Sequence, residues 1–303
     1  MKILVTGRHG QVAAALAERA IAHPSLDFTF ASRPELDLED EASLRAAVHA
    51  HDPDVIVNAA AYTAVDRAEA DEAVAHRVNA LAPAILAEGA RAAGARLIQL
   101  STDYVFDGQG AAPYKESDDT GPISAYGRTK LAGEEAVRAA LPAHLILRTA
   151  WVYSPFGRNF VRTMLGVAGE RETLRVVGDQ IGNPTSAHDI AAAVLTMLER
   201  WRDEGEGPYG TFHFAGAGST SWADFARFVF AVSRDFGGPW ADVVAISSAE
   251  WSTAAARPQN SRLDTAKFQA AFDHMPPCWR DSARRVVERL VRGRAIAGSG
   301  GTA

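Results

Sequence analysis

The sequence comprises 303 residues, of which 47% are hydrophobic and 22% are charged. These proportions are typical of a water-soluble globular protein with enough apolar residues for a substantial core. The formal net charge of −6 argues against nucleic-acid binding and against a basic membrane-binding surface.

Cysteine content and the N-terminal sequence indicate the cellular compartment. The one cysteine, Cys278, rules out an internal disulfide framework and suits a reducing compartment. The N-terminal MKILVTG leads directly into an apolar run without a signal-peptide pattern, and no apolar run is long enough to cross a bilayer. We therefore expect a cytoplasmic protein.

A glycine-containing turn follows the first predicted strand. Residues 2–6 (KILVT) are apolar, GRHGQVA follows, and an alanine-rich helix is expected to about residue 22. Strand, turn and helix in this order are the context that a dinucleotide-binding fingerprint requires. Gly7 lets the chain turn, and Gly10 lets the backbone approach a pyrophosphate at the helix N-terminus. Ala13 stands where the third small residue is usually glycine.

The second predicted strand, 26–31, bears on the choice of cofactor. It ends at Ser32 and Arg33, with no acidic residue in position to bind a ribose 2′-hydroxyl. A hydroxyl and a guanidinium suit a 2′-phosphate better, which favours NADPH with NADH also accepted. The alternative is that Arg33, which precedes Pro34, points into solvent.

The alternation of strands and helices then predicts the fold. Apolar runs at 54–61, 95–101 and 144–153 are expected as strands, with a long helix at 71–93 between the first two. This pattern predicts an α/β protein with a Rossmann-type doubly wound parallel sheet. In the loop after 54–61, Thr63 and Asp66 either face the site or belong to a solvated surface.

The stretch from Ser101 to Glu134 carries the chemistry. Tyr126 and Lys130 are four residues apart in a predicted helix, so they share one face. Ser101 and Thr102 follow the strand at 95–101, at the end where such sheets bind ligands. A positive charge beside the phenol would lower the pKa of Tyr126, and that phenol could protonate a carbonyl oxygen. The alternative is an exposed helix pair without a catalytic role.

The second half has a looser pattern. We expect a Rossmann domain over 1–150, completed by parts of 174–216, and a smaller α/β lobe that binds substrate over most of 151–303. The glycine-rich tail, 297–303, is predicted to be disordered. Four aromatic residues at helical spacing are expected in the core: Trp222, Phe225, Phe228 and Phe230. No histidine, cysteine or carboxylate cluster has metal-ligand spacing, so no metal site is assigned.

Seven motifs in order resemble those of the dTDP-4-dehydrorhamnose reductase family, which belongs to the extended short-chain dehydrogenases/reductases. They are TGxxGQ, DVIVNAAAYTAVDRAE, STDYVFDG, YGRTKLAGE, RTAWVY, GDQxGxPT and RPxNSxLD, and they extend from Lys2 to about Phe272. The resemblance implies reduction of the 4-keto group of dTDP-6-deoxy-L-lyxo-4-hexulose to dTDP-L-rhamnose by a nicotinamide cofactor.

The resemblance also implies roles for individual residues. Catalysis would involve Tyr126 as proton donor, Lys130 at the nicotinamide ribose and Thr102 at the keto oxygen. The cofactor would contact Gly7, Gly10, Gln11, Val12, Ser32, Arg33, Asp37, Leu38, Ala59, Ala60, Tyr62, Tyr126 and Lys130. The sugar nucleotide would contact Thr63, Thr102, Asp103, Tyr104, Tyr126 and Trp151, and weaker candidates for nucleotide or lobe contacts are Gln180, Thr185, Arg257 and Asn260.

Some family members bind Mg²⁺ through acidic residues at a dimer interface, but here TSAHDIA has His188 where an acidic residue is expected. The metal is therefore not carried over, and a monomer or a homodimer is expected. Two other interpretations stay open: a non-catalytic regulatory subunit of methionine adenosyltransferase, and another nucleotide-sugar reductase or epimerase. RTAWVY and GDQIGNPT favour the reductase, because they would build a sugar pocket.

Overall fold

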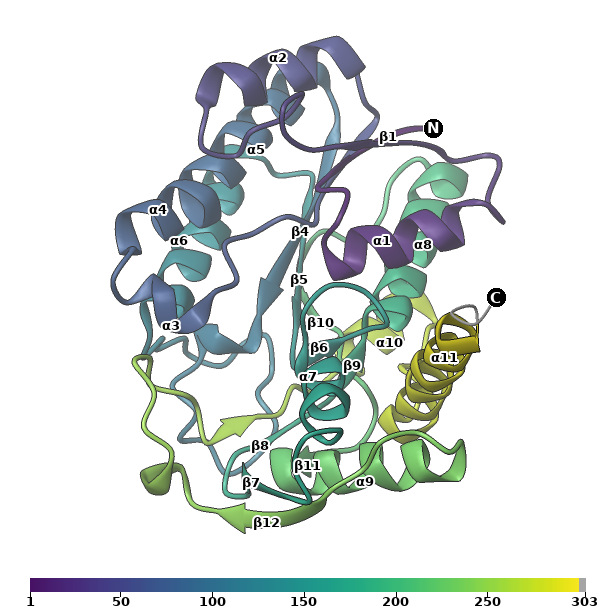
Figure 1. The fold of residues 1–303 in the computed structure, drawn as a ribbon. Helices are drawn as coiled ribbons and strands as arrows, with labels where there is room; N and C mark the ends of the chain where they lie inside the picture. Colours follow the sequence, from purple (N-terminus) through teal and green to yellow (C-terminus); the bar gives the residue numbers. More distant parts are fainter. Residues whose placement is uncertain (300–303) are drawn as a thin grey trace.

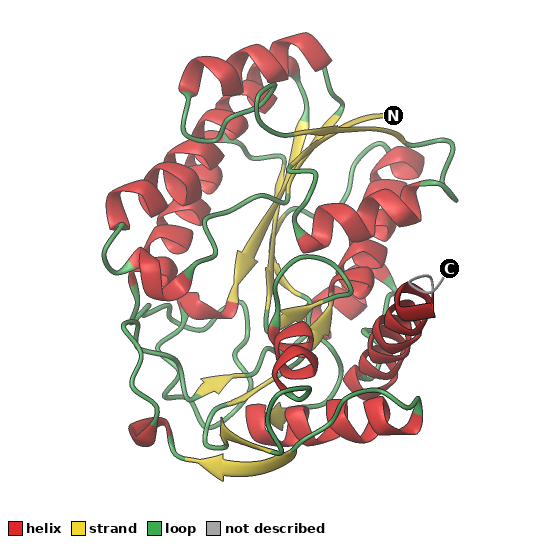
Figure 2. Ribbon diagram, viewed as in Figure 1, coloured by secondary structure: helices red, strands yellow, loops and turns green. Residues whose placement is uncertain are grey.

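A six-stranded parallel sheet forms the centre of the computed structural model, which describes residues 1–299 and their side chains up to residue 293. The strands lie in the order β10–β5–β4–β3–β1–β2, and every neighbouring pair is parallel. Figure 2 shows yellow strands in the middle of the molecule with red helices on both sides. They are β1 (Lys2–Thr6), β2 (Asp27–Ala31), β3 (Val55–Asn58), β4 (Arg96–Thr102), β5 (His144–Thr149) and β10 (Gly210–His213). The predicted α/β class with a parallel, doubly wound sheet is confirmed.

The strand order reverses between β1 and β3. β2 lies on one side of β1 and β3 on the other, and the carboxyl ends of β1 and β3 pair Thr6 with Asn58. Parallel sheets bind ligands outside the carboxyl ends of their strands at such a reversal. Gly7 and Ala59, the residues that follow these two strands, therefore border the natural ligand crevice of this sheet.

Helices cover both faces of the sheet (Figure 1). Their alanine, leucine and valine residues face the strands and are buried, so each helix is held by its apolar side. One face carries α1 (Gln11–Ala20), α8 (Ala187–Glu204) and α10 (Ala266–Phe272), and the other carries α2 (Glu41–His51), α5 (Ala82–Ala93) and α6 (Ala125–Ala140).

The connection from β3 to α5 is more helical than predicted. The segment 61–71, expected as a loop, contains α3 (Val65–Ala68), and the long helix expected at 71–93 is divided into α4 (Glu72–His76), a π-helical turn (Arg77–Leu81) and α5. In the π-helical turn, the Asn79 amide donates to the Tyr62 carbonyl and to the Thr129 hydroxyl of α6. The turn thus ties the segment after β3 to α6.

A second, smaller layer follows β5 and lies below the sheet in Figure 1. Its core contains the predicted core residue Phe225 with Phe230 and Trp279, all buried. It is built from α7 (Phe160–Val167), α9 (Trp222–Asp235), α11 (Trp279–Ser299) and the parallel pair β7 (Thr173–Val177) and β12 (Asp242–Ile246). Of the tail predicted to be disordered, 300–303 lie outside the described residues, and α11 extends to Ser299.

The segment 144–153, predicted as one strand, is divided at Trp151. This residue has φ +49°, a left-handed conformation that a bulky side chain rarely adopts. The turn directs the chain out of the main sheet into β6 (Val152–Tyr153), which pairs with β9 (Thr185–Ser186). Nearby, β8 (Ile181–Gly182) lies between β11 (Thr220–Ser221) and β13 (Asn260–Ser261), and a 3₁₀ turn, Ser248–Glu250, follows β12.

Two glycines allow α6 to pack closely on its neighbours. A Cβ on Gly127 would lie well inside van der Waals contact with the Tyr104 carbonyl, and a Cβ on Gly133 would collide with the Asn79 carbonyl. The Ser124 hydroxyl caps the helix by accepting the Gly127 N–H at 3.2 Å. These contacts fix the position of α6 relative to the carboxyl end of β4.

We therefore expect Gly133→Ala to destabilise the protein by about 1–3 kcal/mol, because the new methyl group forces the π-helical turn away from α6. The matched control is Gly166→Ala in α7, where an added Cβ meets nothing within 4 Å. Alanine favours helix over glycine, so this control should be neutral or stabilising. Thermal melting compares the two variants, and equal melting temperatures would contradict the close packing.

Candidate active site

Three consecutive polar side chains, Ser101, Thr102 and Asp103, are buried at the carboxyl end of β4. The Thr102 hydroxyl donates to Asp103 Oδ1 at 3.0 Å and accepts the Tyr104 N–H at 3.2 Å. It thereby caps a 3₁₀ turn, Asp103–Val105. The strand end is held rigidly by its own side chains.

The predicted catalytic residues meet at this strand end. The Tyr126 side chain, in the first turn of α6, lies beside the Thr102 hydroxyl. The Tyr104 ring stands edge-on to the Tyr126 ring with 5.5 Å between centroids. One turn further along α6, the buried Lys130 ammonium donates to the Leu100 carbonyl at 2.7 Å.

Burial sets the protonation of this tyrosine and this lysine. It raises the pKa of Tyr126 to about 12; the nearby Asp103 charge adds to this rise, and the neighbouring Thr102 hydroxyl opposes it. It lowers the pKa of Lys130 to about 8, against the attraction of Glu134. The expectation that Lys130 lowers the pKa of Tyr126 is therefore wrong for this structure, because desolvation dominates. A phenol that stays protonated at neutral pH is nevertheless the form that donates a proton.

Asp103 is the second unusual acid of the site. Burial raises its pKa to about 6, and the neighbouring Ser261 and Thr102 hydroxyls oppose the rise. Its Oδ2 is buried and has no hydrogen-bond partner among residues 1–299. An unpaired buried oxygen is costly, and such atoms concentrate at functional sites.

A cavity of about 490 Å³ lies at the reversal of strand order. The predicted cofactor residues that line it are Gly7, Ser32, Arg33, Asp37, Leu38, Ala60 and Tyr62. Gly7 has φ +88°, and a Cβ there would come within 3.2 Å of the Ala60 Cβ, so glycine is needed at this turn. This cavity has the position and lining expected for the adenosine half of a dinucleotide.

The start of α1 suits a pyrophosphate. Gly10 caps the helix without a side-chain hydrogen bond, and the first turn contains no acidic residue. Its N–H groups and the positive end of the helix dipole are thus available to an anion. Gln11 is fixed from the other side, because its Oε1 accepts the Ser154 hydroxyl at 2.7 Å. The neighbouring Val12 is buried in the sheet core, and Ala59 packs against that core.

Arg33 lies at the mouth of the cofactor cavity, but its side chain is 72% exposed. Its guanidinium is 3.9 Å from Glu39 Oε1, and Arg77 approaches the other oxygen of Glu39 at 3.5 Å. Arg33 was expected either to bind the 2′-phosphate of the cofactor or to point into solvent. Its side chain is solvated and yet borders the cavity beside Ser32, so each interpretation describes part of the structure.

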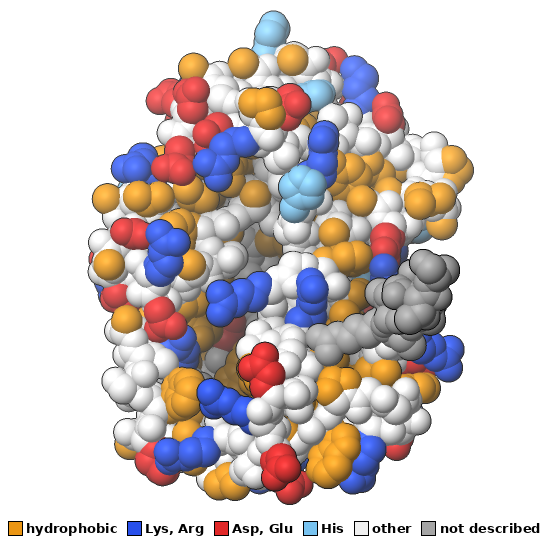
Figure 3. All heavy atoms as spheres, in the orientation of Figure 1, with side chains coloured by type: hydrophobic (Ala, Val, Ile, Leu, Met, Phe, Trp, Pro, Cys, Tyr) orange, Lys and Arg blue, Asp and Glu red, His pale blue; other side chains and the backbone are white. Residues whose placement is uncertain are grey.

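A second cavity, of about 600 Å³, opens between the sheet domain and the smaller layer. Figure 3 shows this face of the molecule hollowed, with Lys and Arg side chains near the hollow. Tyr104, predicted as a contact of the sugar nucleotide, lines this cavity together with Gln180 and Arg257, two of the weaker candidates for nucleotide or lobe contacts. Residues that sequence reasoning did not single out as contacts complete the wall: Phe160, Met164, Arg175, Val176, Val177, Trp222, Ser248, Trp251, Ser252, Thr253, Ala255 and Ala256.

Trp151 supports this wall from behind. Its ring stacks on Trp222 with 3.5 Å between centroids, and a Cβ on Gly182 would overlap it. Trp222 was expected only as a core residue of the aromatic helix, yet it lines the cavity. Its sequence spacing could not show this, because the cavity face of α9 is set by the packing of Trp151.

An ion pair joins the two parts of the chain across the site. The Arg257 guanidinium binds Asp66 through both nitrogens, at 3.0 and 2.6 Å. Arg257 holds the pKa of Asp66 below its usual value. Asp66 therefore binds a residue of the cavity wall, although both Asp66 and Thr63 are exposed.

The other two weaker candidates lie elsewhere. Thr185 is fully buried, and its hydroxyl donates to the Asn183 carbonyl at 2.9 Å. The Asn260 amide donates to the carbonyls of Gly110 and Ala112, which fastens the long loop after β4. Neither residue lines the cavities described above.

The segment expected to differ from the magnesium-binding pattern carries an ion network. Glu18 of α1 accepts both nitrogens of Arg289, at 2.8 and 2.6 Å, and lies 3.0 Å from His188 Nε2. Arg289 first, and His188 also, lower the pKa of Glu18 to about 2. Two side chains thus already occupy this carboxylate, so the residues present do not fit a cation.

Among residues 1–299, no group of three or more His, Cys, Asp and Glu side chains is able to hold a metal ion. Within the same residues, no helix is both long and apolar enough to span a bilayer.

The fold and the site together define an oxidoreductase of the short-chain dehydrogenase/reductase type. A glycine turn stands at the strand reversal of a parallel sheet, and a threonine, a tyrosine and a buried lysine meet at the end of β4. Tyr126 packs against the same alanine cluster as Tyr62, which lines the smaller cavity, and its ring contacts Tyr104, which lines the larger one.

Comparisons with known proteins identify the family. Residues 1–292 match the family described as RmlD substrate binding domain. The dTDP-4-dehydrorhamnose reductase of Sinorhizobium fredii is 46% identical over 96% of this chain and 98% of its own. A crystal structure of such a reductase from Clostridium acetobutylicum superposes with a TM-score of 0.89 at 35% identity, covering 96% of this chain and 99% of that one. The Bacillus anthracis enzyme, solved in complex with NADP, gives 0.88 at 32% identity over 94% and 98%.

The chain therefore belongs to the dTDP-4-dehydrorhamnose reductase family. The resemblance found in the seven motifs is confirmed. The relatives favour the reductase interpretation over a regulatory subunit or an epimerase.

Proposed function

We propose that this protein reduces the 4-keto group of dTDP-4-dehydro-6-deoxy-L-mannose to give dTDP-L-rhamnose, with NADPH as the reductant. The observation that carries the proposal is the meeting of Thr102, Tyr126 and Lys130 between two cavities. One cavity has the lining of a dinucleotide site, and the other is large enough and mixed enough in polarity for a nucleotide sugar.

The cofactor would lie along the carboxyl ends of β1 and β3. Gly7, Gly10, Gln11 and Val12 would contact the pyrophosphate, Ser32 and Arg33 the 2′-phosphate, Asp37 and Leu38 the adenine, and Ala59, Ala60 and Tyr62 the nicotinamide side. When bound, the nicotinamide supplies the hydride that adds to the keto carbon. Lys130 would hold its ribose, since a buried ammonium is a strong donor for hydroxyl groups.

The protein's own part of the reaction is proton delivery. Tyr126 would donate its phenolic proton to the keto oxygen as charge develops there. Thr102 would orient that oxygen from the end of β4, and Asp103 would accept from the sugar or from Thr102. The high pKa of Tyr126 keeps the donor protonated at neutral pH.

The nucleotide half of the substrate would occupy the larger cavity. Aromatic rings of Tyr104, Trp222 and Trp251 offer surfaces for stacking a base, and Trp151 holds Trp222 in place. Arg257 lies where a guanidinium could pair with the diphosphate, and Asp66 orients it. Thr63 would stand at the sugar end.

Three further assignments complete the proposal. Residues 1–150, completed by parts of 174–216, would form the cofactor domain, and most of 151–303 would form the substrate lobe. The enzyme would act in the cytoplasm, because a single cysteine suits a reducing compartment. It would be a monomer or a homodimer. It would work without a bound Mg²⁺, since Glu18 is already paired with Arg289.

A coupled assay tests the proposal. The protein is supplied with dTDP-4-keto-6-deoxyglucose and a 3,5-epimerase, and NADPH oxidation is followed by absorbance. We expect oxidation only when both the keto sugar and the epimerase are present. Oxidation that does not require the epimerase would point to a different nucleotide sugar, and an inactive protein that still binds NADPH would overturn the proposed activity.

Replacement of the proton donor should abolish most of this turnover. Tyr126→Phe keeps the ring and removes the phenolic proton, so we expect kcat to fall by about 10²-fold or more. The dissociation constant for NADPH should change little, which a fluorescence titration checks. A variant with the parental kcat would show that another group delivers the proton.

Arg33→Ala should weaken NADPH binding selectively. A charge-assisted contact with the 2′-phosphate contributes about 1.5–3 kcal/mol, so we expect NADPH affinity to fall by about tenfold or more while NADH affinity is almost unchanged. Arg77→Ala is the matched control, because Arg77 also approaches Glu39 but does not line the cavity. Equal losses for both cofactors, or the same loss in both variants, would show that Arg33 does not read the phosphate.

A further inference from the structure

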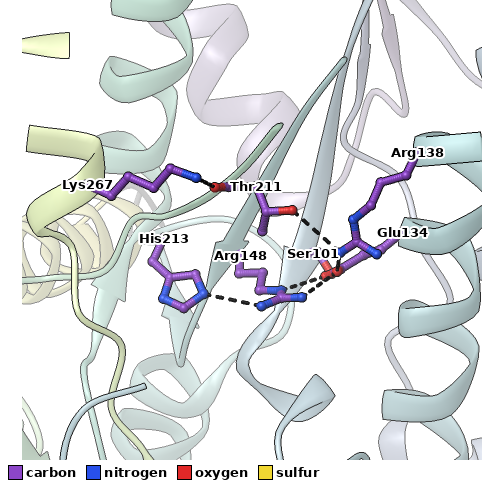
Figure 4. A network of polar contacts seen from close by, with 7 residues as sticks. All are labelled: Ser101, Glu134, Arg138, Arg148, Thr211, His213 and Lys267. Carbon is purple, nitrogen blue, oxygen red and sulfur yellow. Dashed lines mark hydrogen bonds and ion pairs between the residues drawn. The ribbon is translucent and has the colours of Figure 1, made fainter. Parts of the chain in front are cut away.

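A buried carboxylate lies one helical turn beyond Lys130 on α6. Glu134 is 1% exposed and collects contacts from three elements (Figure 4). Its Oε1 accepts the Ser101 hydroxyl of β4 at 2.5 Å, and both its oxygens accept Arg148 of β5, at 2.9 and 2.7 Å. Arg138 of its own helix approaches Oε2 at 2.5 Å.

Glu134 is charged despite its burial. Burial acts to raise its pKa, but the hydrogen bonds and charge of Arg148, with Ser101 and Arg138, hold the pKa below its ordinary value. Such a pair is costly to break, since removing one partner leaves the other buried and uncompensated.

The remaining groups around this pair are neutral or point elsewhere. His213 of β10 lies 3.5 Å from the far side of Arg148, and burial, with the charge of Arg148, lowers the pKa of His213 to about 4. Lys267 donates to the Thr211 carbonyl and does not contact Glu134. The charges that face Glu134 are therefore Arg148 and Arg138, with Lys130 one turn away.

The contacts of α6 with β4 alternate between catalysis and support. Thr102 lies beside Tyr126, the Leu100 carbonyl accepts the Lys130 ammonium, and the hydroxyl of Ser101, which lies between Leu100 and Thr102 in β4, donates to Glu134. Tyr126, Lys130 and Glu134 are spaced four residues apart and so lie on one face of α6. Glu134 is the farthest of these three residues from the N-terminus of α6, and its ion pair with Arg148 joins it to the adjacent strand, β5.

We propose that Glu134 is a positioning residue for the reduction: it clamps the turn of α6 that carries Lys130 and supplies the negative charge that keeps the Lys130 ammonium protonated. The inference rests on the proposed function, because Lys130 matters only if it serves the cofactor and Tyr126. No reacting atom touches Glu134, so its effect passes through Lys130.

The physical need for this charge is plain. Desolvation lowers the pKa of Lys130 to about 8, and the attraction of Glu134 is what opposes it. A lysine with a depressed pKa loses its charge as pH rises through that value. Without the carboxylate the charge would be lost at still lower pH, close to the working range.

The test compares two variants that break the same ion pair. Glu134→Gln removes the negative charge, whereas Arg148→Met removes the positive charge and leaves Glu134 paired with Arg138. We measure the NADPH dissociation constant and kcat/KM from about pH 6 to about pH 10. In Glu134→Gln, the fall of NADPH affinity and of kcat/KM at basic pH should begin about one pH unit lower than in the parent. In Arg148→Met, the pH at which this fall begins should not move downward.

Two further variants separate the charge from the structure. Glu134→Gln combined with Arg148→Met leaves no charge at either position and should be more stable than Glu134→Gln alone. Its NADPH affinity and kcat/KM should still begin to fall at the same lowered pH as in Glu134→Gln. Glu135→Gln makes the same chemical change one residue away at an exposed position and should match the parent throughout.

The inference would be overturned if the pH at which NADPH affinity and kcat/KM begin to fall moved equally in the two single variants. It would also be overturned if this pH stayed at the parental value in Glu134→Gln or in the double variant. The NADPH titration needs no turnover, so this outcome is distinguishable from failure of the proposed reductase activity.

Discussion

The close contact of α6 with the carboxyl end of β4 is the constraint on which the site depends. Gly127 and Gly133 bring the helix against backbone carbonyls. Leu100 and Ser101 form hydrogen bonds with two different turns of it, and Thr102 lies beside Tyr126 in its first turn. A helix held only by apolar packing could slide by fractions of an ångström. These polar contacts at buried positions leave one alignment of phenol, hydroxyl and ammonium, and proton transfer requires such alignment.

Burial has opposite effects on the two titrating groups at this contact. It favours the neutral form of both, so Tyr126 stays protonated while Lys130 is brought close to deprotonation. A reductase needs both the proton on its tyrosine and the charge on its lysine. The first follows from burial directly, whereas the second needs a counter-charge. This difference explains why the buried Glu134–Arg148 ion pair, one helical turn beyond Lys130, matters to the reaction.

Local sequence predicted much of this fold and site. The β1 turn at Gly7, the strand end at Thr102 and the spacing of Tyr126 and Lys130 are short-range patterns, and the sheet and the meeting of these groups follow from them. What the sequence could not show depends on contacts between distant segments. Trp222 lines a cavity because Trp151 adopts a left-handed conformation and stacks on it. Arg257 and Asp66 pair across 191 positions.

The error about the pKa of Tyr126 has the same origin. A lysine four residues away is visible in the sequence, but the desolvation of the phenol by surrounding segments is not. The division of 144–153 into β5 and β6 was likewise hidden, because an apolar run does not reveal a turn at Trp151.

Isotope transfer tests the central claim most directly. The protein is incubated with the epimerised keto sugar and NADPH that carries deuterium at the transferring position, and the product is analysed by mass spectrometry and NMR. If the site works as derived, the deuterium appears at C4 of a dTDP-linked 6-deoxyhexose with the rhamnose configuration. A product without deuterium at C4, or with the opposite configuration there, would contradict the account.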